Sequence, residues 1–128
     1  MASPAVLDSS AILAVIFQEP GAERVSDLLN GGLLSTVNLA EVHTVLALRG
    51  VPPDRIRGRV EEMGCEVCLF NEEQAHLTGE LVAKTSAYGL SLGDRACLAL
   101  ALDRKATVYT ADRNWKNLGL AVEVNVIR

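Results

Sequence analysis

Four acidic residues of this chain stand where a folded protein could bring carboxylates together. Asp8 ends a short β-rich run, "PAVLD", and Asp112 lies two residues after Thr110 in "ATVYTAD". Asp94 opens an apolar stretch directly after the turn "GLSLG", and Glu41 lies within "NLAEVHTVLALRG". Neighbouring carboxylates repel one another, so a cluster of them either takes up protons or binds a cation. We therefore ask what holds each acid in place.

Glu41 is the hardest of the four to explain as a structural residue. A helix over residues 37–48, turning by about 100° per residue, would place its apolar side chains in a stripe. The predicted core face consists of Val37, Val45 and Leu48. Glu41 falls in the middle of this stripe, where burial of an unpaired carboxylate is costly. Either an arginine, with Arg95 as the candidate, or a bound cation would have to compensate its charge.

Each aspartate has a structural alternative. Asp8 could cap the helix that starts in "DSS", Asp94 could belong to a capping box in "SLGD", and Asp112 could cap the turn that enters "RNWKN". Capping and metal binding are compatible, because a helix N-terminus stabilises a carboxylate in either role. A cation shared by all four acids would explain them together, and all-oxygen ligands favour Mg²⁺ or Mn²⁺ over zinc or copper.

Strand-like and helix-like stretches alternate along the chain. The expected strands are "PAVLD", "LLST", "CEVCLF", "ATVYTAD" and "AVEVNVI". The expected helices are "DSSAILAVIF", "EPGAERVSDLL", the stretch around Glu41, "PPDRIRGRVEEM", one long helix "EEQAHLTGELVAKTSAYG" and the buried "LGDRACLALALDRK", with "RNWKNLG" as a short helix or turn. This alternation predicts an α/β fold with a mostly parallel sheet covered on both faces. Ligands of such sheets bind beyond the carboxyl ends of the strands.

The composition indicates a globular protein that is not held to nucleic acid by overall charge. The 128 residues are 49% hydrophobic and 22% charged, and they suffice for one domain with a proper core. No apolar run approaches the roughly 20 residues that cross a bilayer, and no secretion signal is evident, so we expect a cytoplasmic protein. The net charge of −4 means that a nucleic-acid role needs a local basic region or a metal.

Two further groups of residues were weighed as functional sites. The run "RGVPPDRIRGR" supplies Arg49, Arg55, Arg57 and Arg59, which form either a local basic region or a solvated helix face. The "CEVC" pair at Cys65 and Cys68 lies in a strand-like run, which does not suit a redox motif. Cys97, His43 and His76 do not complete a zinc site at any recognisable spacing. We expect buried, inert thiols.

Four motifs resemble those of PIN-domain ribonucleases in order and spacing. They are "VLDSSAILA", "TVNLAEV", "LSLGDRACLALA" and "VYTADRNW", and the similarity covers essentially the whole chain. The sequence is most similar to the VapC toxins of bacterial toxin–antitoxin pairs. This resemblance implies a three-layer α/β/α sandwich with a central parallel sheet, with residues 1–128 as a single PIN-like nuclease domain that is usually a homodimer.

The resemblance also implies roles for individual residues. The acids that match the family's metal-binding, catalytic quartet are Asp8, Glu41, Asp94 and Asp112. Thr110 matches a hydroxyl residue that supports the site, and Ser9 matches the small polar residue after the first acid. Asn38 matches another frequent position. Asn114 stands where some members carry a further acid, which leaves the number of metals open.

The function implied is a Mg²⁺- or Mn²⁺-dependent endoribonuclease toxin that hydrolyses RNA with metal-activated water. Its expected partners are the RNA substrate and a VapB-type antitoxin that obstructs the acidic pocket, without a role for a membrane. One alternative is an aspartate-based phosphatase or phosphotransferase, although those enzymes generally need a second acid where this chain has Ser10. The other alternative is a non-catalytic metal- or RNA-binding module.

Overall fold

Five short parallel strands form the centre of the computed structural model, which describes residues 3–128. The strands are β1 (Ala5–Leu7), β2 (Leu33–Ser35), β3 (Glu66–Cys68), β4 (Thr107–Thr110) and β5 (Val124–Val126). Their order in the sheet is β3-β2-β1-β4-β5, and every pairing is parallel. The carboxyl ends of β1 and β4, which are neighbours, therefore meet at the same edge of the sheet. The predicted parallel sheet is confirmed.

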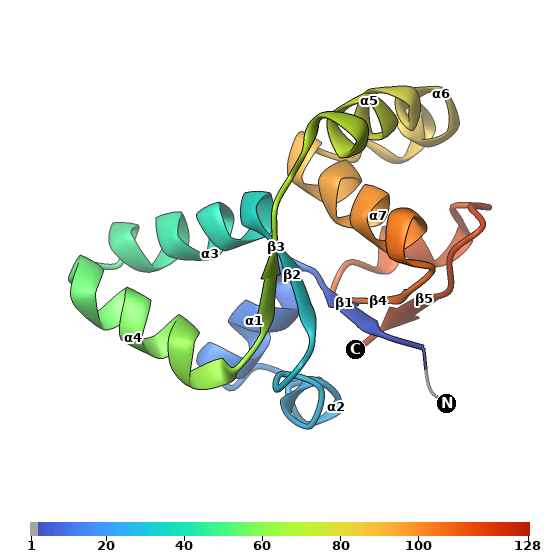
Figure 1. Cartoon of the computed structure of the whole chain (residues 1–128). Helices are drawn as coiled ribbons and strands as arrows, with labels where there is room; N and C mark the ends of the chain where they lie inside the picture. Colours follow the sequence, from blue (N-terminus) through green and yellow to red (C-terminus); the bar gives the residue numbers. More distant parts are fainter. Residues whose placement is uncertain (1–2) are drawn as a thin grey trace.

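Helices cover both faces of this sheet (Figure 1). They are α1 (Ser9–Ile16), α2 (Glu23–Ser26), α3 (Thr36–Leu48), α4 (Pro53–Met63), α5 (Glu72–Glu80), α6 (Val82–Thr85) and α7 (Leu92–Arg104), with 3₁₀ helices η1 (Ser86–Tyr88) and η2 (Arg113–Asn117). Two separate clusters of buried side chains lie on the two faces, one around α7 and η2 and one around α1, α3 and α4. The expected three-layer α/β/α architecture is confirmed. No helix within residues 3–128 has the length and apolar character needed to cross a membrane.

The predicted buried helix is α7, whose central residues are inaccessible to solvent. Every side chain from Ala96 to Ala101 is buried. This explains why the helix is apolar all round rather than amphipathic. It packs against the sheet on one side and against α5 on the other. The N-terminus of α7, where Asp94 lies, is thereby fixed close to β1 and α3.

The sequence-based prediction differs from the structure in the helix after β3. One long helix was expected over residues 72–89, whereas the chain forms α5, α6 and η1 in succession. Gly89 closes this segment with a positive φ of 65°, as its position predicted. The short α2 likewise replaces a longer expected helix, because residues 20–22 form a turn before it.

The predicted core face of α3 is wrong. Leu48 is 84% exposed, and Val37 and Val45 are only half-buried. The side chains that face the interior are Asn38, Val42 and Leu46. The helix is apolar on more than one side, so its pattern alone does not select the buried stripe. Glu41 consequently lies at the margin of the core and is half-buried rather than enclosed.

Candidate active site

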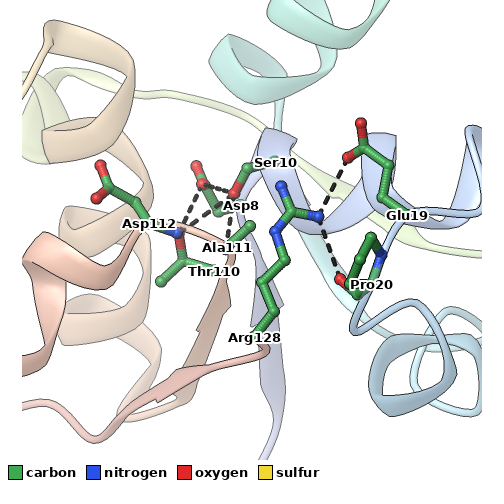
Figure 2. Close-up of polar contacts among 8 residues, drawn as sticks. All are labelled: Asp8, Ser10, Glu19, Pro20, Thr110, Ala111, Asp112 and Arg128. Carbon is green, nitrogen blue, oxygen red and sulfur yellow. Dashed lines mark hydrogen bonds and ion pairs between the residues drawn. The ribbon is translucent and has the colours of Figure 1, made fainter.

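Asp8 is buried at the carboxyl end of β1, with only 3% of its surface exposed. Its Oδ2 accepts hydrogen bonds from Ser10 Oγ at 2.6 Å and from Thr110 Oγ1 at 3.0 Å (Figure 2). Its Oδ1 is equally buried but has no hydrogen-bond partner in residues 3–128. Asp8 occupies the N-cap position of α1, yet its side chain makes no capping hydrogen bond. The capping alternative is therefore wrong, and one buried oxygen is left for a ligand.

Two hydroxyl groups connect the end of β4 to the start of α1. Thr110 Oγ1 accepts a hydrogen bond from the Asp112 backbone N–H at 3.1 Å while it donates to Asp8. Ser10 Oγ accepts from the Ala111 backbone N–H at 2.9 Å while it donates to Asp8. Figure 2 shows both hydroxyls converging on the same carboxylate oxygen. Asp8 is thus held rigidly by two neighbouring segments.

The structure brings Ser10 to Asp8, a contact that the sequence reasoning missed. The resemblance pointed to Ser9, the first of two adjacent serines, whereas Ser10 Oγ makes the hydrogen bond to Asp8. Thr110, which was expected to support the site, does contact Asp8. The start of α1 decides which serine faces β4, and only the three-dimensional arrangement reveals it. The signal in the sequence was limited to a second hydroxyl two residues after the acid.

Burial and neighbouring charges raise the pKa of Asp8. The pKa rises from 3.8 to about 6, first because the carboxyl is removed from water. The hydrogen bonds from Ser10 and Thr110 act in the opposite direction, and the charges of Asp94 and Glu41 raise the pKa further. The same three carboxylates, after burial, raise the pKa of the buried Cys97 thiol on α7. The carboxylates of Glu41 and Asp94 therefore lie close enough to Asp8 to repel its negative charge.

Asn38 and Gly93 position the carboxylate of Glu41. Asn38 Nδ2 donates to Glu41 Oε1 at 2.8 Å and to the Gly93 carbonyl oxygen at 3.1 Å. A Cβ atom at position 93 would overlap the Glu41 carboxylate, so only glycine allows this approach. Glycine in a helix costs about 1 kcal/mol relative to alanine. The glycine in "LGD" was therefore the feature of the sequence that could have indicated a close contact at this position. Glu41 is thus placed beside the N-terminus of α7.

Asp94 and Asp112 perform the capping roles that the sequence allowed. Asp94 Oδ2 accepts from the Ser91 backbone N–H at 2.9 Å, and Ser91 Oγ accepts from the Asp94 backbone N–H at 3.1 Å, which completes a capping box. Asp112 Oδ1 accepts from the Asn114 backbone N–H at 2.9 Å and caps η2. Each interaction uses one carboxylate oxygen, so the second oxygen of each group lies outside the cap.

No protein cation neutralises these acids in the part of the chain that the structure describes. Its ion pairs join Glu72 to His76, Glu66 to Arg104 and Glu19 to Arg128. Arg95, the arginine considered for Glu41, instead donates from Nη1 to the Thr78 carbonyl oxygen at 2.8 Å. The ion-pair explanation for Glu41 is therefore wrong. Within residues 3–128, the Glu41 carboxylate accepts a hydrogen bond from the Asn38 amide and forms no ion pair.

The oxygen ligands of this cluster suit a hard divalent cation, although the side chains are not arranged in a complete coordination shell. Asp8 contributes a buried oxygen without a partner, and Glu41 and Asp94 add carboxylate charge nearby. All of these donors are oxygen atoms, as Mg²⁺ and Mn²⁺ prefer. As the side chains lie, no three His, Cys, Asp or Glu residues between positions 3 and 128 form a group ready to hold a metal. Asp112 is joined to this group through Thr110 Oγ1, which accepts from the Asp112 backbone N–H and donates to Asp8.

The cysteines do not extend this site toward zinc or redox chemistry. Cys65 is half-buried, Cys68 and Cys97 are buried, and all three are free thiols. Burial is the largest cause that raises the pKa of each. A raised pKa keeps a thiol protonated and unreactive near neutral pH. The interpretation of "CEVC" as inert side chains fits these environments.

The fold and the site together define an α/β/α domain with an acidic cluster at the carboxyl ends of its central strands. Residues 5–120 match the model of the PIN domain. The chain belongs to the PIN domain family, whose members are nucleases. Comparison of the sequence with curated proteins gives no significant match.

Solved structures of toxin–antitoxin proteins share this fold. A DNA-bound VapBC from Salmonella typhimurium is similar with a TM-score of 0.71 and 20% identity, over 98% of each chain. A toxin–antitoxin complex from Klebsiella pneumoniae has a TM-score of 0.70 and 17% identity, over 94% of this chain and 99% of that chain. VapBC-5 from Mycobacterium tuberculosis has a TM-score of 0.61 and 24% identity, over 100% and 99%. At these identities the comparison establishes a common fold.

Proposed function

We propose that this protein is a VapC-type toxin, a Mg²⁺- or Mn²⁺-dependent endoribonuclease with residues 1–128 as one nuclease domain. The observation that carries the proposal is the environment of Asp8. A carboxylate that is 3% exposed, with one unpartnered oxygen and two further acids nearby, requires a proton or a cation. In a nuclease family, a divalent cation is the more economical explanation, because it also prepares the pocket for phosphate.

The residues of the chain take complementary roles in this proposal. The acids that would hold the cation are Asp8, Glu41, Asp94 and Asp112. A bound Mg²⁺ or Mn²⁺ would lower the pKa of a water molecule and offset charge on the scissile phosphate. Ser10 and Thr110 hold Asp8 Oδ2, which leaves Oδ1 for the ligand.

Three further residues act on these acids rather than on substrate. Asn38 orients Glu41 through its side-chain amide. Asn114 supports Asp112 through its backbone N–H, not through its side chain. Ser9 remains a supporting residue by family resemblance alone. Partners that orient metal ligands typically contribute about 10- to 100-fold in affinity or activity.

The structural neighbours support a protein partner and a place in toxin–antitoxin biology. Three of the most similar solved structures are a toxin–antitoxin complex and two VapBC proteins. We therefore propose a VapB-type antitoxin as the cognate partner, RNA as the substrate, a homodimer as the assembly and the cytoplasm as the site of action. An aspartate-based phosphatase is disfavoured, because Ser10 already donates to Asp8 where such enzymes need an acid.

Cleavage of RNA by the purified protein tests the proposal. Wild type and Asp94→Asn are incubated with labelled single-stranded RNA in Mg²⁺, Mn²⁺ or EDTA. Asparagine can still accept the hydrogen bond from Ser91, so the capping box survives while the charge is lost. We expect wild type to cleave only with metal, and the variant to be slower by at least about 100-fold, as when a charge-stabilising group is removed.

A matched control separates the site from general charge effects. Asp54→Asn removes an exposed acid in the first turn of α4 and should leave cleavage unchanged. Equal cleavage by wild type and a folded Asp94→Asn protein would refute the assigned site. Sequencing of RNA 5′ ends after a brief pulse of expression, with Asp94→Asn as the reference, would then identify the RNA target.

A further inference from the structure

A basic cavity lies along the edge strand β5. Four cationic side chains line this cavity of about 450 Å³, namely Arg24, Arg113, Lys116 and Arg128. They come from α2, from η2 and from the chain after β5, and no acidic residue of the described chain lines the cavity with them. We call these four residues the basic pocket. Such a concentration of positive charge is unexpected in a chain whose net charge is −4.

The arginines of the basic pocket are anchored by hydrogen bonds, and Arg128 is in addition paired with Glu19. Arg24 Nη1 donates to the Val126 carbonyl oxygen at 3.2 Å, and Arg113 Nε donates to the Arg128 carbonyl oxygen at 3.1 Å. Each guanidinium has five N–H donors, so most of them remain available to a ligand. Among the ion pairs of residues 3–128, only Arg128 of this pocket takes part, with Glu19. Anchored guanidinium groups suit the oxygen atoms of a phosphate.

The basic pocket adjoins the acidic site through the sheet. Arg113 directly follows Asp112, and Val126 is paired in register with Thr110. The Ile127 backbone N–H also donates to the Thr110 carbonyl oxygen at 2.9 Å. Because β4 alone separates β5 from β1, the axes of β1 and β5 are about 10 Å apart at roughly 4.8 Å per strand. Figure 2 shows the Arg128 guanidinium turned toward Glu19 and Pro20, with Asp8 between Arg128 and Asp112 in this view.

The arginine-rich run on α4 is a weaker candidate for the same role. Arg55, Arg57 and Arg59 are exposed along a single helix. Two of them share a shallow cavity with Glu62, which offsets part of their charge. The basic pocket instead gathers cations from three segments of the chain around one cavity. A converging arrangement is what phosphate recognition requires, whereas a helix face is commonly just solvated.

We propose that the basic pocket binds a phosphate group of the RNA strand next to the scissile bond and so positions the substrate. The proposal rests on the function proposed above and names the part of the chain that recognises the nucleic-acid backbone. A strand whose scissile phosphate lies at Asp8 would carry a neighbouring phosphate over β5. The basic pocket thereby offsets the repulsion between RNA and the acidic cluster.

RNA binding without cleavage tests the basic pocket directly. Asp94→Asn protein is titrated with fluorescein-labelled single-stranded RNA in Mg²⁺, at several salt concentrations, by fluorescence anisotropy. In that background, the double variant Arg24→Gln and Lys116→Gln removes one cation from α2 and one from η2. Neither residue is a direct sequence neighbour of an acid of the quartet. We expect RNA affinity to fall about tenfold, and the slope of log affinity against log salt to decrease by about 0.7, the value for one phosphate on a single strand.

The control is Lys84→Gln, which removes an exposed cation on α6, far from the C-terminal strand in Figure 1. It should change neither the affinity nor the salt slope. If the double variant behaves like this control, the proposal that the basic pocket binds RNA is refuted. The same holds if the Asp94→Asn protein does not bind RNA at all.

Cleavage measurements separate the two proposals. In the otherwise wild-type protein, the double variant should raise KM for RNA about tenfold with little change in kcat, because the basic pocket does not touch the reacting atoms. A wild-type protein that binds RNA through the basic pocket but never cleaves it would refute the nuclease proposal alone. Cleavage with an unchanged KM in the double variant would refute the basic pocket alone.

Discussion

Replacement of Asp8 by asparagine should stabilise the metal-free protein by an amount that grows with pH. The pKa of Asp8 is raised from 3.8 to about 6, chiefly by burial. Between these two pH values the folded protein binds more protons at Asp8 than the unfolded chain does. Its stability therefore falls as the pH rises through this range, and the full penalty is present above pH 6. At about 1.4 kcal/mol for each pH unit, the penalty amounts to about 3 kcal/mol.

The Asp8→Asn variant removes this penalty but keeps much of the hydrogen bonding. The asparagine Oδ1 can accept from Ser10 and Thr110, as Asp8 Oδ2 does. Its amide then occupies the position of the unpartnered Oδ1, near two carboxylates that can accept from it. An amide that finds no acceptor would cost about 1–3 kcal/mol, which sets the lower bound on the gain. We expect a net gain of up to about 3 kcal/mol above pH 7 and no gain near pH 4.

Urea unfolding in EDTA at several pH values between 4 and 8 measures this difference. The quantity to compare is the free energy of unfolding of the variant minus that of wild type, which cancels the other titrating groups. Asp54→Asn, an exposed substitution on α4, is the control in the same measurement. A pH-independent difference for Asp8→Asn, or a destabilised variant above pH 7, would refute the argument from burial.

Two other substitutions test how the site is built. Gly93→Ala would place a Cβ against the carboxylate at the end of the flexible Glu41 side chain, so it should displace that carboxylate and impair metal binding with little change in the free energy of unfolding. In contrast, Gly58→Ala on α4 meets no atom within 4 Å and should stabilise by up to about 1 kcal/mol. Ser10→Ala removes a hydrogen bond that lowers the pKa of Asp8, so the pH midpoint of Mn²⁺ binding should rise by about one unit. Ser9→Ala should leave that midpoint unchanged, and an equal shift in both variants would contradict the assignment.

The sequence was sufficient to predict the layers of the fold and the strand ends where the aspartates lie. Short β-rich runs alternate regularly with helices, and this alternation predicts a parallel sheet. The order of the strands was not predictable, because it depends on contacts between distant segments. The proximity of Asp112 to Asp8 follows from that order, because β4 is the neighbour of β1.

Glu41 shows most clearly where sequence reasoning fails. The stripe that was predicted to be buried proved to be half-buried or exposed, because α3 turns Asn38, Val42 and Leu46 to the interior instead. The Asn38 Nδ2 donates to Glu41 and to Gly93, which lies 55 residues away. A polar side chain with such a distant partner looks like a surface residue in the sequence. The prediction that Glu41 belongs to the acidic cluster did not depend on the correct buried face of α3, since the face that was predicted to be buried is wrong.

The central claim is that Asp8, Glu41 and Asp94 form one site for a divalent cation. Titration of the protein with Mn²⁺, followed by the electron paramagnetic resonance signal of the free ion at pH 7.5 (about 1.5 pH units above the pKa of Asp8), tests it most directly. We predict that wild type and Asp54→Asn bind Mn²⁺, and that Asp8→Asn and Asp94→Asn lose this binding. Retention of the same Mn²⁺ affinity by a folded Asp8→Asn protein would contradict the claim.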